Sequence, residues 1–587
     1  MHIAFKFKYI HSNGLFTRLS QRIGESSSLD INAYNDKDIF YIESSGTQAE
    51  LEELATLISS IVPQSLFLHQ STIEEIDRLS AVTLSINETS YYKIPYCIEC
   101  QNAVIETLNP FNECSVCGFS DVEVKSKNFG CLDFGLLADS LIENKELVIE
   151  TFNGKRRFAL LSTQEQAETS ILICDPSHIS EQFLLTQGEL EVLMMVEKPS
   201  IRLKPKLMFY HENELQKPIY SVFFADDKIT LALTTALAKK GVIALYCDKA
   251  PSLRVATALG ENIIVNVGRD VLPWEHKFKS NVPLCSSFAG YNAYVDTKGL
   301  VLSDTQRQRS EKAVEFVSAN SFNKKENTIS FMPAHGALRS VVLEQGLDNK
   351  SLCMLYLSRE YDSHICSYSP KIGYTSMVNF IDESLSSPKA MLEAIASMDE
   401  AGQRLIDNFK NTYPKLYETL LDTQMDSNEN SSTLTKLWAM AAHFIGITNE
   451  QNYKVASEYL EVTALEFQGK SGPRIDYKVL KKDTGYQLDP RLAIRSAISF
   501  KLAGVDEYLL SFGFIDSLAD FMAEQAEFSD GNIGIDGVVI AGSLFENHQL
   551  LMRAYNALSP NYEVLRNKRL SIDGANIAAG AVTLGSE

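Results

Sequence analysis

Two cysteine pairs form the most specific pattern in this sequence: residues 97–100 read Cys97-Ile98-Glu99-Cys100, and residues 114–118 read Cys114-Ser115-Val116-Cys117-Gly118. Thirteen residues separate the pairs. Each pair can bring two thiolates to one ion, and two pairs complete the tetrahedral four-sulfur shell that zinc favours. Because the protein supplies all four ligands, we expect a structural zinc site with no open position for catalysis. The alternative is a set of buried cysteines at fortuitous spacing.

The rest of the chain bounds the possible function classes. With 587 residues, the chain exceeds a single core, and about three to five domains are expected. The formal net charge of −21 disfavours nucleic acid as a partner. No apolar run is long enough for membrane insertion, and no signal peptide is evident, which indicates a cytoplasmic protein. Ten cysteines are too few for a disulfide scaffold in a chain of this length.

Hydrophobic periodicity predicts an α+β unit before the cysteines and mixed α/β sequence after them. The first ~70 residues read as strand, helix, strand, strand, helix, strand, which is the order of a ferredoxin-like split βαβ domain. Further along, residues 218–224, 229–238 and 242–247 read as strand, helix and strand. Residues 422–432 are rich in Asp, Asn, Gln and Ser, so we expect a loop there.

A buried apolar strand is expected at residues 538–541, and it runs into Gly542-Ser543-Leu544-Phe545-Glu546-Asn547. Ser543 and Asn547 flank the expected start of a helix, where free amides and the positive end of the helix dipole can bind a phosphate. The alternative is an ordinary strand-to-helix turn. A second motif, Asp573-Gly574-Ala575-Asn576, follows near the end of the sequence.

These motifs, in this order and separation, resemble those of the HypF family, the carbamoyltransferases of NiFe-hydrogenase maturation. The family has a G-G-V-F-Q-N turn and then N-D-G-G at the corresponding places. The resemblance implies an acylphosphatase-like domain at 1–85, a four-cysteine zinc module at 86–125, an abbreviated YrdC-like domain at 126–285 and a Kae1-like domain of the ASKHA type at 286–587. The chain lacks the family's second zinc finger and is similar to the shorter HydE-type hydrogenase accessory proteins.

The resemblance also implies candidate site residues. ATP or AMP would contact Gly542, Ser543, Asn547 and Gly574. A second divalent metal would be held by Glu360, His364 and Asp573, with Glu360 and His364 four residues apart on a helix; the alternative is a solvated carboxylate beside an ordinary histidine. In the acylphosphatase-like domain, Arg18 is the candidate catalytic residue, although it is displaced within the loop at 11–18 that corresponds to the family's phosphate cradle.

The sequence departs from the family at several places where chemistry would occur. The family's D-G-x-G-Y-G-x-D-G loop is reduced to Ile372-Gly373-Tyr374, and its E-G-Q helix motif becomes Tyr453-Lys454-Val455. Bulkier side chains at such positions would crowd a nucleotide. We therefore favour a maturation scaffold or chaperone that recognises a hydrogenase subunit or a HypE-like maturation protein. The alternative is an active carbamoyltransferase that uses carbamoyl phosphate and ATP to carbamoylate a partner cysteine. A third reading, tRNA binding, is disfavoured by the acidic charge.

Overall fold

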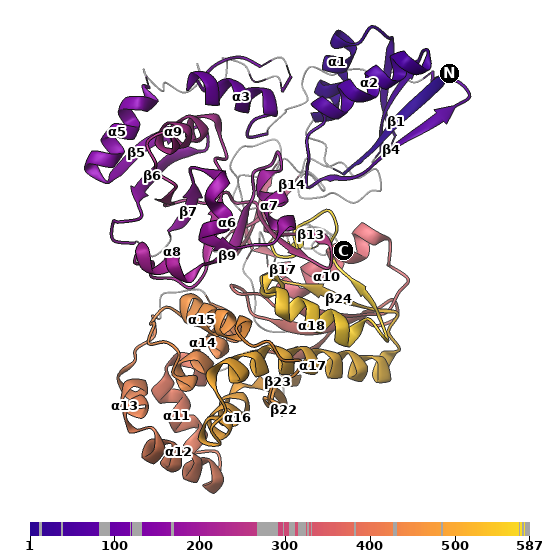
Figure 1. Ribbon diagram of the computed structural model, residues 1–587. Helices are drawn as coiled ribbons and strands as arrows, with labels where there is room; N and C mark the ends of the chain where they lie inside the picture. The colour runs from indigo at the N-terminus through magenta and orange to yellow at the C-terminus, as the bar shows by residue number, and fades with distance from the viewer. Residues whose placement is uncertain are drawn as a thin grey trace. The chain divides into compact units, whose positions relative to one another are not determined.

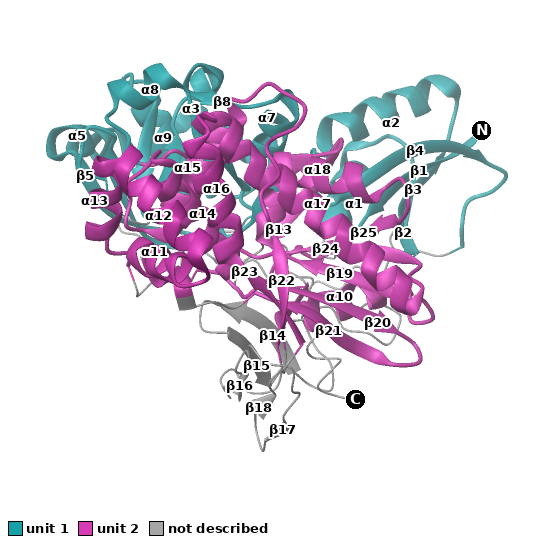
Figure 2. Cartoon of the chain, turned by 90° about the horizontal axis from the view of Figure 1, so that it is seen from below, with its two compact units in different colours: residues 1–216, 220–255, 270–284 teal, residues 217–219, 256–269, 285–587 magenta. Residues whose placement is uncertain are grey.

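The computed structural model describes residues 1–10, 15–36, 39–81, 94–114, 116–117, 119, 132–165, 169–266, 291–296, 299–304, 312–314, 324–325, 328–329, 332–380, 383–426, 431–482, 485–574, 576–577 and 580. The chain divides into two compact units (Figure 2). The first comprises residues 1–216, 220–255 and 270–284, and the second comprises residues 217–219, 256–269 and 285–587.

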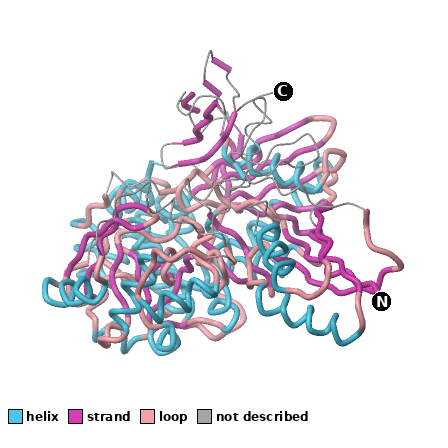
Figure 3. Tube along the Cα trace, turned by 90° about the horizontal axis from the view of Figure 1, so that it is seen from above, coloured by secondary structure: helices cyan, strands magenta, loops and turns pink. Residues whose placement is uncertain are grey.

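The first unit begins with a four-stranded antiparallel sheet in the order β2-β3-β1-β4. Its elements are β1 (His2–Tyr9), α1 (Leu15–Ser26), β2 (Ile31–Asp36), β3 (Ile39–Ser45), α2 (Gln48–Ile61) and β4 (Leu68–Ile76). Ile3, Phe5, Phe7 and Tyr9 of β1 are buried, which explains the period-two pattern of the sequence. Figure 3 shows the helices beside this sheet. The expected split βαβ arrangement is present, with the last strand beginning at Leu68.

The rest of the first unit is a mixed sheet with the four cysteines beside it. The strands β12, β9, β10, β7, β11, β6 and β5 are neighbours in that order, and β8 pairs with β9. The elements are α3 (Ile98–Thr107), α5 (Phe134–Asn144), β5 (Glu146–Thr151), β6 (Gly154–Leu160), β7 (Ser170–Ile173), η1 (Pro176–His178), α6 (Ile179–Gln182), β8 (Phe183–Leu184), α7 (Gln187–Met194), β9 (Ser200–Pro205), α8 (Leu207–Glu212), β10 (Tyr220–Phe223), α9 (Lys228–Ala238), β11 (Ala244–Cys247) and the start of β12 (Arg254–Ala258). The end of β12 and all of β13 (Glu261–Asn266) belong to the second unit.

The helix α9 positions the cysteines relative to this sheet. Almost every side chain of α9 is buried, because one face covers the sheet and another packs against α3. Cys97, Cys100, Cys114 and Cys117 belong to the same hydrophobic cluster as Ile229 and Leu233 of α9. The four-cysteine module therefore shares a core with the mixed α/β sheet and is not an independent appendage.

The second unit is built on a seven-stranded sheet in the order β22-β23-β21-β20-β19-β24-β25. Strands β19, β20 and β21 form an antiparallel meander, whereas β19-β24-β25 are parallel. These strands are β19 (Leu352–Tyr356), β20 (His364–Ser369), β21 (Gly373–Asn379), β22 (Lys478–Lys482), β23 (Gly485–Asp489), β24 (Gly537–Ala541) and β25 (Glu563–Leu565). Further strands of the second unit are β14 (Tyr291–Asp296), β15 (Gly299–Asp304), β16 (Lys312–Val314), β17 (Lys324–Lys325) and β18 (Thr328–Ile329).

Helices α11, α13, α15, α16 and α17 of the second unit contact the buried helix α14. Figure 1 shows α11 to α16 grouped together. Their bounds are α10 (Pro333–Gln345), η2 (Glu383–Ser386), α11 (Pro388–Ala396), α12 (Glu400–Thr412), α13 (Pro414–Asp422), α14 (Thr433–Ile445), α15 (Tyr453–Leu465), α16 (Pro490–Leu502), α17 (Glu507–Ile533), η3 (Ser543–Glu546) and α18 (His548–Leu558). Trp438 at the centre of α14 is fully buried and donates to the Tyr477 hydroxyl, 3.2 Å away. Among the described residues, no helix is long and apolar enough to cross a bilayer.

Candidate functional site

The four cysteines predicted as zinc ligands converge on one point. Cys97 caps the N-terminus of α3 and Cys100 lies in its first turn, while Cys114 and Cys117 come from the loop that follows. The sulfurs of Cys97 and Cys114 are 3.6 Å apart, and those of Cys100 and Cys117 are 3.5 Å apart. All four sulfurs lie within 4.8 Å of one another and are buried. Gly118 lies outside the described residues.

This arrangement fits a tetrahedral metal ion. Zinc–sulfur bonds of about 2.3 Å place the sulfurs of a regular tetrahedron about 3.8 Å apart, close to the spacing found here. In the part of the chain that the structure describes, these four residues are the only group of three or more His, Cys, Asp or Glu side chains able to hold an ion. Every donor is a thiolate, so the centre can bind a metal structurally without leaving a position for substrate.

The candidate catalytic residue Arg18 lies on α1 and is exposed. An acylphosphatase cradle needs a guanidinium fixed beside several backbone amides, whereas Arg18 is placed on the outer surface of a helix. Residues 11–14, which would supply the amides, lie outside the described residues. The structure therefore offers no preformed anion cradle among the described residues around Arg18.

The turn after β24 corresponds to the predicted phosphate site, but its amides already have partners within the protein. Gly542 donates to the Ile572 carbonyl at 2.8 Å, and Leu544 donates to the Leu357 carbonyl at 3.0 Å. The Ser543 amide donates to the Asp573 carboxylate at 2.8 Å. The segment that follows is a four-residue 3₁₀ turn, η3, and not the start of a long helix. The expected free amides at Ser543 are therefore absent, because the chain's own oxygens occupy them.

Gly542 is required by the geometry of this turn. Its φ is +104°, a conformation that side-chain-bearing residues rarely adopt. A Cβ atom there would lie 2.1 Å from the Leu357 carbonyl oxygen, so β24 and the end of β19 can approach only through glycine. Gly574, another candidate nucleotide contact, also has a positive φ, +102°, beside Asn266.

Asp573 is fully enclosed by hydrogen-bond donors. Besides the Ser543 amide, the hydroxyls of Tyr356 and Ser358 each donate to its carboxylate at 2.7 Å. Burial raises the pKa of Asp573, and these donors counteract that rise. Burial, followed by the charge of Asp573, also raises the pKa of Tyr356 well above its ordinary value. A carboxylate that accepts three bonds from the protein has little capacity left for a metal ion.

The predicted second metal set does not assemble. The segment of Glu360 and His364 is a loop that enters β20, so the expected helical spacing of four residues is wrong. His364 lies opposite Tyr356 in the strand pairing, and its Nε2 is 2.9 Å from the Ser376 hydroxyl. Burial lowers the pKa of His364 to about 3, which keeps the ring neutral. His364 and Asp573 thus bond to different neighbours in this arrangement, and a metal held by Glu360, His364 and Asp573 stays a prediction.

A buried ion pair that sequence reasoning missed lies beside this network. The Arg359 guanidinium donates two hydrogen bonds to the Glu461 carboxylate, at 2.5 and 2.9 Å. Asn547, a predicted nucleotide contact, donates its side-chain amide to Glu461 at 2.9 Å and caps α18 through Leu550. The Arg359 backbone amide donates to the Ser543 hydroxyl at 3.0 Å. Opposite charges at 359 and 461 carry no local sequence signal, because about a hundred residues separate them.

Three comparisons with known proteins bear on this fold. Residues 380–581 match the family model described as carbamoyltransferase, Kae1-like domain, second subdomain. The crystal structure of full-length HypF in the phosphate- and nucleotide-bound form superimposes with a TM-score of 0.62, covering 100% of this chain and 98% of that one at 14% identity. The chain is HypF-like. The HypF of T. kodakarensis gives a TM-score of 0.59 at 12% identity, with the same coverage.

A curated relative agrees with this HypF-like assignment. Protein HydE of Wolinella succinogenes is 25% identical over 423 residues, which cover 71% of this chain and 69% of the relative. The resemblance to HypF and to HydE-type proteins is therefore confirmed, as is the multidomain α/β and α+β fold with a Kae1-like domain. At 12–14% identity, the structural matches establish the fold of the HypF-like chain and not its chemistry.

Proposed function

We propose that this HypF-like chain is an accessory protein of NiFe-hydrogenase maturation that acts as a scaffold or chaperone and has lost catalysis. The observation that carries the proposal is the closed network around Asp573. The motif residues that would contact a nucleotide and a metal in a carbamoyltransferase bond to one another here, through the Ser543 amide and the hydroxyls of Tyr356 and Ser358. A site satisfied by its own groups gains little from a ligand.

The proposal includes finer assignments. The four cysteines hold zinc, which stabilises the module at 86–125 between an acylphosphatase-like domain at 1–85 and a YrdC-like domain at 126–285; the Kae1-like domain spans 286–587. The partner is a hydrogenase subunit or a HypE-like maturation protein, met in the cytoplasm. The whole-chain similarity to HypF and the relation to HydE support this role. A protein that only recognises a partner needs the HypF-like fold but does not need an open catalytic site.

An active carbamoyltransferase is the second candidate, favoured by the match of residues 380–581 to a carbamoyltransferase domain. Titration calorimetry with ATP and AMP, with and without Mg²⁺, separates the two functions. We expect no heat of binding, and we expect no ATP–pyrophosphate exchange upon addition of carbamoyl phosphate; an active HypF serves as the positive control. A hydrogenase subunit or maturation protein should co-purify with the tagged chain from its own host. Exchange that depends on carbamoyl phosphate would overturn the scaffold proposal.

A further inference from the structure

Lys228, the first residue of α9, places a buried cation against the four-cysteine module. Its side chain is only 1% exposed. Its Nζ donates to the Asn112 carbonyl oxygen at 2.7 Å and lies 3.6 Å from the centre of the Phe119 ring. Asn112 precedes Cys114 by two residues and Phe119 follows Cys117 by two. The ammonium group is therefore held on the loop that carries the second cysteine pair.

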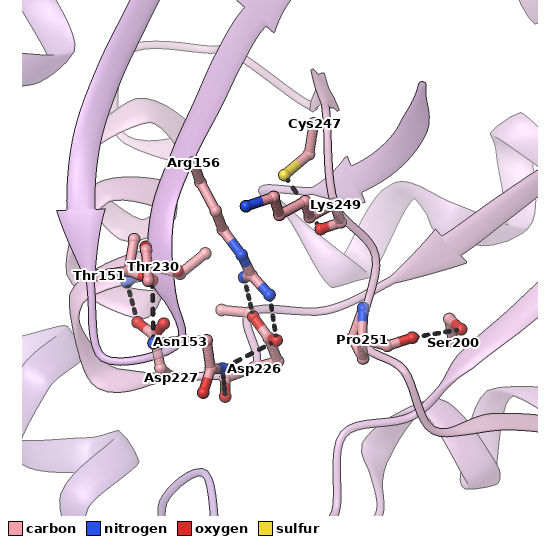
Figure 4. A network of polar contacts seen from close by, with 12 residues as sticks. Thr151, Asn153, Arg156, Ser200, Asp226, Asp227, Thr230, Cys247, Lys249 and Pro251 are labelled. Carbon is pink, nitrogen blue, oxygen red and sulfur yellow. Dashed lines mark hydrogen bonds and ion pairs between the residues drawn. The ribbon is translucent and has the colours of Figure 1, made fainter. Parts of the chain in front are cut away.

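The start of α9 is fixed independently of the cysteines. Arg156 pairs with the Asp226 carboxylate through two hydrogen bonds, one of them 2.7 Å long, and Asn153 donates to the same carboxylate at 3.0 Å (Figure 4). Asp227 then caps the helix by accepting from the Thr230 amide at 2.7 Å. Lys228 thus extends from a preorganised turn, and the neighbouring acid, Asp226, is already paired with Arg156.

The first cysteine pair is docked on the same turn. Tyr96, which directly precedes Cys97, donates its hydroxyl to the Ala225 carbonyl at 2.6 Å. Both cysteine pairs therefore contact the short segment that begins α9, one through Tyr96 and the other through Lys228. These two contacts connect the start of α9 to both halves of the module.

Charge balance gives this lysine a role. A divalent ion bound by four thiolates leaves a net charge of about −2 in a buried place. Uncompensated buried charge is strongly unfavourable, and a nearby cation reduces that cost. Burial lowers the pKa of Lys228, whereas the charges of the four cysteines raise it. The contacts of its Nζ with Asn112 and Phe119, on either side of the second cysteine pair, place the ammonium group beside the module.

We propose that Lys228 is a positioning residue for the metal centre, where its ammonium group compensates the negative charge of the metal–thiolate group and couples metal affinity to the first turn of α9. The inference rests on metal binding by the four cysteines, and it holds whether or not the protein catalyses a reaction. Partners outside the ligand shell commonly change metal affinity about ten- to a hundredfold when removed.

Zinc affinity of the full chain, measured by competition with a chromophoric chelator, tests the proposal. The zinc content of the wild-type protein is determined first, so that failure of the metal assignment is recognised separately. Lys228→Gln removes the charge but can still donate to Asn112, whereas Lys228→Met removes both. Lys239→Met is the matched control. Lys239 directly follows α9, and its Nζ also donates to a backbone carbonyl of α3, that of Ile105, at 3.3 Å. Unlike Lys228, it is exposed.

We expect both Lys228 variants to bind zinc about ten- to a hundredfold more weakly than the wild type, and Lys239→Met to keep wild-type affinity. Wild-type affinity in Lys228→Gln overturns the charge role, whether or not Lys228→Met is weakened. Equal weakening in Lys239→Met overturns it as well. If a Lys228 variant is unfolded at stoichiometric zinc, recovery of its circular dichroism spectrum in excess zinc supports the proposal, because a weaker site refills by mass action. Failure to recover contradicts it.

Discussion

The four-cysteine module and the Asp573 network are both buried polar clusters, yet they differ in what completes them. In the module, four thiol groups face one another at 3.5–3.6 Å across two contacts, and a cation is the natural partner for such donors. Around Asp573, each carboxylate oxygen already accepts hydrogen bonds from the protein. One cluster has the donors and the spacing to hold an ion, and the carboxylate of the other is already bonded to groups of the protein.

The difference separates two roles that a retained motif can have. The four cysteines can bind a metal ion, and binding by four thiolates would add folding free energy to the module. The turn at Gly542 and the acid at Asp573 connect β24, β19 and the segment before Asn576 through hydrogen bonds. These motif residues of the second unit therefore have a structural role within the protein itself.

The largest effect is expected from removing one thiolate of the module. Cys114→Ser should reduce zinc from stoichiometric to trace amounts and unfold the module, because structural zinc sites contribute about 10–16 kcal/mol of apparent binding free energy. Metal analysis and thermal unfolding of the full chain measure both consequences. Cys174→Ser is the control, since Cys174 is buried in the first unit but is not one of the four converging cysteines. Stoichiometric zinc in the Cys114 variant would remove this residue from the ligand set.

A smaller effect is expected from the ion pair beside Asp573. Arg359→Met leaves the Glu461 carboxylate buried without its bidentate partner and should lower the free energy of unfolding by about 3–5 kcal/mol. In the variant Arg359→Met with Glu461→Gln, most of this loss should return, because the neutral amide can still accept from Asn547. Urea unfolding measures both.

An exposed pair provides the matched control for this effect. Lys350 lies 3.3 Å from Asp536, and both side chains are more than two-fifths exposed. Lys350→Met should therefore cost less than about 1 kcal/mol. If Arg359→Met lowers the free energy of unfolding no more than Lys350→Met does, the ion pair of Arg359 and Glu461 does not stabilise the second unit.

A third and still smaller effect on the free energy of unfolding is expected when the pH is lowered. The pKa of His364 is lowered to about 3, below its ordinary value of 6.5, so the unfolded chain binds the proton more readily below pH 6.5. The contribution of His364 to the free energy of unfolding is fully present near pH 7. It should fall by about 2 kcal/mol by pH 5. Unfolding of His364→Gln should show a shallower decline between pH 7 and 5 than the wild type. Parallel curves would mean that His364 titrates normally.

How far the sequence predicted each cluster depends on the separation of its members. The four cysteines lie within 21 residues, so spacing alone predicted their convergence. The Asp573 network joins segments near 356, 461, 543 and 573. Tyr356, Arg359 and Glu461 were not predicted, because no local pattern indicates which distant groups will meet. The helix expected at 360–364 was wrong, because His364 pairs with Tyr356 and Asn379 in the sheet and this pairing overrides the local spacing.

The close approach of β24 to Leu357 has a consequence for how homologous chains should be compared. Only a residue lacking a side chain fits at position 542, so selection for a properly folded second unit alone is sufficient to conserve it. In an alignment, an invariant glycine at this place would not distinguish working enzymes from inactive descendants. The more informative columns are those of Tyr356, Ser358 and Arg359, whose side chains form the hydrogen bonds to Asp573 and Glu461 in this chain.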